Sequence, residues 1–255
     1  MTTTDPLPRM PAASNRASGG AAFHTTRWTL VGRAKADSDE GRRALRDLCD
    51  AYYEPVAAFL RYELRDAEAA SDLTHGFFAG VLAGGTFARA ERDHGRFRSY
   101  LLGAVKHFLS HHRESLRSLK RGGGVSEVSL DDEDALEARS LPDSGVLSPD
   151  LAFDRQWALT VLARALDALR AECVAHGCPE LFDNIKPWLT GDAVHGDQAS
   201  AAAACGMNAN AFKVAVHRMR KRFRQLVKDE VSGTLDDPCQ VDDEMRSLFA
   251  ALGGS

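Results

Sequence analysis

The chain has 255 residues, of which 44% are hydrophobic and 27% are charged, and its formal net charge is -4. This composition is that of a soluble globular protein with room for about two domains of ordinary size. The negative net charge excludes a protein that binds polyanions through its bulk charge, so any affinity for nucleic acid must come from local basic surfaces.

Cysteine usage and hydropathy predict a cytoplasmic location; the nucleoid as the place of action is an expectation that depends on the DNA-binding motifs described below. The five cysteines are odd in number and lack paired spacing, which fits a reducing compartment. No apolar run approaches the ~20 residues of a membrane span, and no basic segment precedes an apolar one at the start of the chain. We therefore expect no membrane as a partner.

Apolar residues recur at helical spacing and strand alternation is nearly absent, so the sequence predicts an all-α protein. Residues 1–22 are rich in Thr, Pro, Ala, Ser and Gly, which predicts a disordered tail. Pro55 is expected to open a short helix of its own, because proline suits a first turn. The other helices expected in the first domain, 23–121, cover about 27–34, 39–53, 66–82 and 93–119.

A flexible acidic linker is expected over 122–147, where Gly122–Gly124 is followed by a cluster of acids. The linker is either a solubilising tether or a shield for a basic surface. The second domain, 148–231, begins at Ser148 and Pro149, which have the pattern of a cap and a first turn. Its first helix is expected to end near His176, and a short helix over 181–189 follows.

The segment from Gln198 to Lys228 predicts a helix, a tight turn and a second helix, which together form a helix-turn-helix. Gly206 suits a turn that needs positive φ, and Asn208 is a good N-cap. No Asp or Glu occurs between Asp197 and Asp229, and such a one-sided basic helix indicates an acidic partner. The apolar positions of this second helix are Val214, Val216, Met219, Phe223, Leu226 and Val227.

The first domain has its own basic helix, GRFRSYLLGAVKHFLSHHRESLRSLKRGGG, from Gly95 to Gly124. Basic groups beside aromatic rings suit single-stranded nucleic acid, because cations neutralise phosphates and rings stack on bases. For Phe97 and Phe108 a place in the core is favoured over base stacking.

The extension 232–255 is acidic and apolar, and this pattern predicts a short amphipathic helix that folds back on a basic surface.

Three motifs, in this order, resemble RNA polymerase sigma factors of the two-domain extracytoplasmic-function type. They are DLTHGFFAGVL (Asp72–Leu82), GRFRSYLL (Gly95–Leu102) and GMNANAFKVAVHRMRKRFR (Gly206–Arg224). Further similar pieces are TTRWTLV (Thr25–Val31), LFDNIKPWLTGD (Leu181–Asp192) and DDPCQVDDEMRSLFAAL (Asp236–Leu252). The resemblance covers roughly residues 23 to 252 and implies a factor that binds core RNA polymerase and promoter DNA to initiate transcription.

The resemblance also implies roles for matched positions. The residues implied for docking on polymerase are Asp72, Leu73, Phe77, Phe78 and Leu82. The residues implied for the minus-ten element are Arg96, Arg98, Ser99, Tyr100, Lys106, His107 and Arg113, with Thr86 and Phe87 in the loop 83–90 as further candidates. The residues implied for the minus-thirty-five element are Asn208, Asn210, Lys213, His217, Arg218 and Arg222.

The docking helix departs from the pattern of the resembled factors, which carry several acids there. Ser71, His75 and Gly76 stand where acids or an amide are expected, so core docking is expected to be weakened. Phosphorylation of Ser71 or Thr74 by a Ser/Thr kinase would restore negative charge, which makes such a kinase or another regulator an expected partner.

Two other classes of protein compete with this interpretation. An enzyme is disfavoured because no nucleophile, paired carboxylates or phosphate-binding loop is evident, and we expect no cofactor. Cys173, His176 and Cys178 lack an evident fourth ligand for zinc, so no metal site is predicted. A helix-turn-helix repressor or activator that acts without sigma activity remains the alternative.

Overall fold

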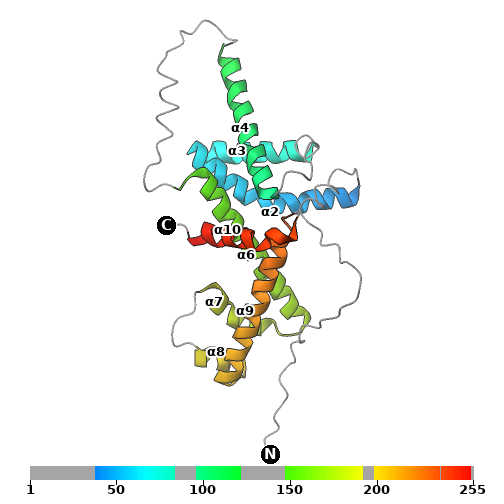
Figure 1. Cartoon of the computed structure of the whole chain (residues 1–255), viewed down its shortest axis with the longest axis vertical. Helices are drawn as coiled ribbons and strands as arrows, with labels where there is room; N and C mark the ends of the chain where they lie inside the picture. The colour runs from blue at the N-terminus through cyan, green and yellow to red at the C-terminus, as the bar shows by residue number, and fades with distance from the viewer. Residues whose placement is uncertain (1–37, 84–95, 122–146, 192–197, 236, 254–255) are drawn as a thin grey trace, which may run out of the picture. The chain divides into compact units, whose positions relative to one another are not determined.

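The computed structural model describes residues 38–83, 96–121, 147–191, 198–235 and 237–253. Within those residues the regular structure is entirely helical, with eight α-helices, one short 3-10 helix and no strand (Figure 1). The all-α prediction is therefore confirmed for this part of the chain. The expected tail 1–22, the expected helix over 27–34, the loop 84–90 and nearly all of the acidic linker lie outside the described residues. No helix in the described ranges is both long enough and apolar enough to cross a bilayer.

The described residues form two compact units. The smaller unit comprises those from Ala165 to Leu226, and the larger unit comprises those up to Arg164 together with those from Val227 onward. Two helices contribute to both units: α6 (Pro149–Ala175) and α9 (Ala209–Ser232). The expected second domain, 148–231, therefore has residues in both units.

The larger unit is built around α2 (Asp39–Leu64), α3 (Ala67–Leu82) and α4 (Phe97–Arg121), and α2 packs against α3 (Figure 1). Aromatic rings join α4 to both of these helices. The ring of Phe97 lies 5.1 Å from that of Tyr52, and the rings of Phe77 and Phe108 lie 5.6 Å apart, both pairs edge to face. Edge-to-face pairs of this kind add specific geometry to the burial of apolar surface.

Helix α2 continues through Pro55, so the prediction of a separate helix beginning at this proline is wrong. A proline inside a helix removes one hydrogen bond and costs about 3 kcal/mol. Burial of the next turn offsets this cost, because Val56, Phe59 and Leu60 are at most 2% exposed. Tertiary packing here outweighs a local signal that normally marks a helix boundary.

The C-terminal extension is part of the core of the larger unit. After α9 come a 3-10 helix, η4 (Pro238–Gln240), and α10 (Val241–Gly253), which agrees with the amphipathic helix expected there. Leu248 is fully buried, and Met245 is 8% exposed. The Phe97 N–H donates a hydrogen bond of 3.3 Å to the carbonyl of Thr234, which ties the start of α4 to this segment.

The smaller unit contains the last part of α6, α7 (Pro179–Thr190), α8 (Gln198–Ala204) and the first part of α9. Its core includes Leu169, Phe182, Ile185, Phe212 and Met219. The ring of Trp188 meets that of Phe212 edge to face at 5.3 Å. The core therefore fixes one side of α9 and leaves its other side to solvent.

Replacing Leu248 with Ala should lower the free energy of unfolding by about 2–5 kcal/mol, because a fully buried side chain leaves a cavity. The neighbouring Phe249 is 60% exposed, and Phe249→Ala should change stability by no more than about 0.5 kcal/mol. Denaturant unfolding followed by circular dichroism measures both values. Equal effects of the two variants would contradict the packing of α10.

Candidate nucleic-acid interface

The turn between α8 and α9 is held by two backbone hydrogen bonds. The Met207 N–H donates to the Ala202 carbonyl at 2.8 Å, and the Gly206 N–H donates to the Ala203 carbonyl at 2.9 Å. This pair of bonds is the Schellman pattern that ends many helices. It needs a left-handed residue, and Gly206 has φ +63°. The prediction that this glycine supplies a positive φ is confirmed.

Asn208 caps α9, as the sequence predicts. Its Oδ1 accepts a hydrogen bond of 2.8 Å from the Ala211 N–H, which satisfies one of the unpaired donors of the first turn. The side-chain oxygen of Asn208 is therefore engaged with the helix, while its residue remains exposed. Asn208 fixes the start of the helix whose following residues face solvent.

The exposed side of α9 carries most of the residues expected at the minus-thirty-five element. Phe212, Val216 and Met219 face the core. The opposite side of the helix is exposed and carries Asn210, Lys213, His217 and Arg218. Val214, one of the apolar positions of the expected helix, is 51% exposed and lies beside Lys213 on this surface. We call Asn210, Lys213, Val214, His217 and Arg218 the α9 surface.

Arginines further along α9 contact the rest of the smaller unit. Arg222, which was expected to contact DNA, donates to both carboxylate oxygens of Glu172 at 2.5 and 2.9 Å. The hydrogen bond from Arg222 holds the pKa of Glu172 below its usual value, against the opposing effect of burial. Arg220 donates twice to the Trp188 carbonyl, at 2.9 and 3.1 Å. Both arginines therefore help to hold α9 on its unit.

The basic residues expected at the minus-ten element lie on or just before α4, and four of them pair with carboxylates. Arg96 pairs with Glu244 at 3.0 Å. Lys106 pairs with Asp150 at 2.7 Å, and Arg113 with Glu63 at 2.9 Å. The fourth is Arg98, which is itself buried. The sequence gives no sign of these partners, because each lies at least 44 residues away along the chain.

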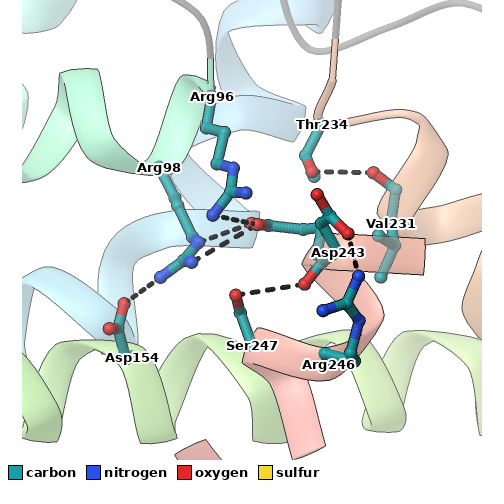
Figure 2. A network of polar contacts seen from close by, with 9 residues as sticks. Arg96, Arg98, Asp154, Val231, Thr234, Asp243, Arg246 and Ser247 are labelled. Carbon is teal, nitrogen blue, oxygen red and sulfur yellow. Dashed lines mark hydrogen bonds and ion pairs between the residues drawn. The ribbon is translucent and has the colours of Figure 1, made fainter. Parts of the chain in front are cut away.

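Arg98 is the most buried of these cations, since its side chain is 10% exposed. It contacts the carboxylates of Glu244 and Asp154 (Figure 2). Its guanidinium also lies 4.8 Å from the centre of the Trp157 ring. Burial alone would lower the pKa of Arg98, but the hydrogen bond to Glu244 and the negative charges of Asp154 and Glu244 outweigh it and raise the pKa. Arg98 thus stays charged inside the unit.

The remaining minus-ten candidates differ in their accessibility. Ser99 and His107 are exposed, and His107 lies 3.2 Å from His111, measured between their Nε2 atoms. Tyr100 is half-buried beside Phe97, and this burial raises the pKa of its hydroxyl. Phe97 is fully buried, in line with the core position favoured for it. Thr86 and Phe87 lie outside the described residues.

The docking candidates on α3 divide into core and surface. Phe77 and Phe78 are buried, Leu73 is half-buried and Asp72 is exposed. The side chain of Leu82 lies outside the described part. Two further residues were expected as phosphorylation sites. Of these, Ser71 is exposed, whereas Thr74 is fully buried and its hydroxyl donates to the Ala70 carbonyl at 2.7 Å. A kinase could reach Ser71 on this surface, but not Thr74.

Within the described residues no group of three or more His, Cys, Asp or Glu side chains is placed to hold a metal ion. Cys173, a member of the weighed zinc set, is buried, and burial together with neighbouring Cys178 raises its pKa to about 11. A protonated thiol is a poor metal ligand.

Comparisons with family models, curated proteins and solved structures find no match for this chain.

Two substitutions of Asn208 should separate capping from DNA contact. Asn208→Ala should lower the free energy of unfolding by about 1 kcal/mol because the cap is lost. Asn208→Asp should keep the cap and the stability while it places negative charge at the α9 surface. Thermal unfolding checks the first effect and duplex-DNA binding checks the second. Equal unfolding of Asn208→Ala and wild type would contradict the capping role.

The lowered pKa of Glu172 predicts a pH-dependent stability. A depressed pKa in the folded state adds stability above the unfolded value of 4.5 and loses it as pH falls through the folded value. Glu172→Gln should therefore be less stable than wild type at neutral pH, and the gap should close below pH 4.5. This difference in stability should be small, because the side chains of Glu172 and Arg222 are 36% and 41% exposed.

Urea unfolding across the acid range measures this effect. Asp167→Asn, which removes another exposed carboxylate of the same unit, is the matched control. A constant gap between Glu172→Gln and wild type at every pH would contradict the ion pair with Arg222.

Proposed function

We propose that this chain is an RNA polymerase sigma factor of the extracytoplasmic-function type, which binds core polymerase and directs it to promoters. The observation that carries the proposal is the α9 surface. This surface follows a capped turn, and it faces solvent because the opposite side of α9 is apolar and buried. A helix presented in this way has the form of the recognition helix of a helix-turn-helix. The other two parts of the proposal, binding of core polymerase and a second contact with DNA, rest on the resemblance in motif order.

In this proposal the first turns of α9 enter the major groove of the minus-thirty-five element. Asn210 has the donor and acceptor that match the edge of an adenine, and Lys213 has donors for guanine or a phosphate. Val214 offers a methyl surface for the methyl group of a thymine. His217 and Arg218 lie about one turn further along and would contact bases or phosphates.

The proposed minus-ten contact belongs to α4. Its cations would bind phosphates of the melted strand, and half-buried Tyr100 would stack on an unpaired base. This part of the proposal requires that the carboxylates now paired with these cations give way to DNA.

The proposed polymerase contact belongs to α3. Asp72 would supply an exposed acid for a basic polymerase helix, and half-buried Leu73 would supply an apolar edge. Buried Phe77 and Phe78 would support this surface rather than touch the polymerase. A phosphate on exposed Ser71 would add the acidity that this helix lacks relative to the resembled factors.

Run-off transcription with purified core polymerase and a library of promoters tests the function. Wild type should direct specific transcripts, and the pair of substitutions Lys213→Ala and His217→Ala should reduce them about tenfold or more, because each lost base contact costs about 1–3 kcal/mol. Lys186→Ala, which removes an exposed cation of the same unit, should retain activity. The absence of any promoter-specific transcript with wild type would refute the proposal.

Core binding has its own test by pull-down or fluorescence titration. Asp72→Ala should weaken binding of core polymerase and Ser71→Glu should strengthen it, because each changes the acidity of the same exposed side of α3. Asp47→Ala removes an exposed carboxylate of α2 and should leave binding unchanged. No change with either α3 variant would count against docking through this helix.

A helix-turn-helix repressor or activator is the second candidate. It is favoured by the pairing of the α4 cations, since such a regulator needs only the α9 surface. It predicts sequence-specific duplex binding without any affinity for core polymerase, so the pull-down separates the two functions.

A further inference from the structure

Carboxylates from α6 and α10 face the cations of α4. We call them the carboxylate set; its members are Asp150, Asp154 and Glu244. The Nη1 atom of Arg96 lies 3.0 Å from Oε2 of Glu244, and Nζ of Lys106 lies 2.7 Å from Oδ2 of Asp150. Arg98 contacts two members of the set at once (Figure 2). The three cations and the three carboxylates all belong to the larger unit.

Glu244 is the centre of this arrangement. It is fully buried, and its two oxygens accept from Nε and Nη2 of Arg98 at 2.5 and 3.3 Å. Arg96 also pairs with this carboxylate, since its Nη1 lies 3.0 Å from Oε2 of Glu244. A guanidinium fork binds a phosphate in the same two-pronged manner as a carboxylate. Glu244 therefore occupies a position that suits a phosphate oxygen.

The spacing within α6 extends the same pattern. Asp150 and Asp154 are four residues apart, so they lie on one side of the helix. They are 49% and 30% exposed, whereas Glu244 is fully buried. Together the three acids meet Arg96, just before α4, and Arg98 and Lys106, in the first half of α4. A row of anions beside a row of cations is what a nucleic-acid backbone would also provide.

We infer that the carboxylate set occupies the phosphate-binding face of α4 and holds the protein in a closed state that DNA must displace. The inference rests on the proposed function in one respect, since it takes α4 as a DNA-contacting helix. DNA and the carboxylate set compete for the same arginines. The apparent affinity for DNA is then the affinity of the open state multiplied by the fraction of molecules in which the face is open.

Glu244→Gln tests this competition. Glutamine keeps the shape of the side chain and removes its charge, while Asp154 remains beside Arg98 to support the fold. Binding of a fluorescein-labelled, mixed-sequence single-stranded DNA should become about tenfold tighter than for wild type, within the usual range of coupling between competing sites. Fluorescence anisotropy at low salt measures the change.

Asp243→Asn is the matched control. It removes the same charge from the neighbouring residue of α10, whose carboxylate contacts Arg246 and not the arginines of α4. This control should bind DNA as wild type does. The gain from Glu244→Gln should also disappear when Arg96 is replaced with Gln. If Glu244→Gln binds no more tightly than Asp243→Asn, the carboxylate set is only part of the core and the inference is overturned.

Hydrogen exchange on the unaltered protein decides the matter if Glu244→Gln does not fold. The amides of α10 should exchange slowly in the free protein and faster when the single-stranded DNA is added. Unchanged protection of α10 at saturating DNA would overturn the inference.

Transcription assays separate failure of this inference from failure of the proposed function. If wild type directs transcription and the DNA affinity of Glu244→Gln is unchanged, the function stands and the closed state does not. If neither protein supports transcription but Glu244→Gln binds DNA more tightly, the closed state stands and sigma activity does not.

Discussion

A buried ion pair between Arg98 and Glu244, 146 residues apart in the chain, ties α10 to the start of α4 within the larger unit. Taking both charges out of water is costly unless each finds good partners. Here Glu244 receives a second arginine, Arg96, while Arg98 also contacts Asp154 and the face of Trp157. These requirements fix the start of α4, the start of α6 and α10 relative to one another.

The parts of the fold that depend on neighbours in sequence could be predicted. Gly206 and Asn208 predict the turn before α9, because the backbone next to them needs a left-handed residue and a helix cap. Ser148 likewise marks the start of α6, where its hydroxyl accepts from the Leu151 N–H at 3.2 Å. The exposed positions Asn210 and Lys213 follow from the same helical periodicity.

The parts that depend on distant partners could not be predicted. The local sequence around the basic residues of α4 is the same whether these residues face water, DNA or carboxylates. Nothing near them in the sequence therefore indicates that Asp150 and Glu244 are their partners. Pro55 lies inside α2 because distant residues bury its surroundings. Val214 fits the apolar period of α9, but the core of the smaller unit ends before it reaches this side of the helix.

The discontinuous make-up of the larger unit has a consequence for its folding during synthesis. Residues 165–226 are contiguous, so the smaller unit can form as soon as they leave the ribosome. The larger unit must wait for Glu244 and Leu248, and contacts of such long sequence separation form slowly. For that interval Arg96 and Arg98 lack the carboxylate of Glu244, so the nascent chain carries these two arginines without the buried partner that they share in the folded protein.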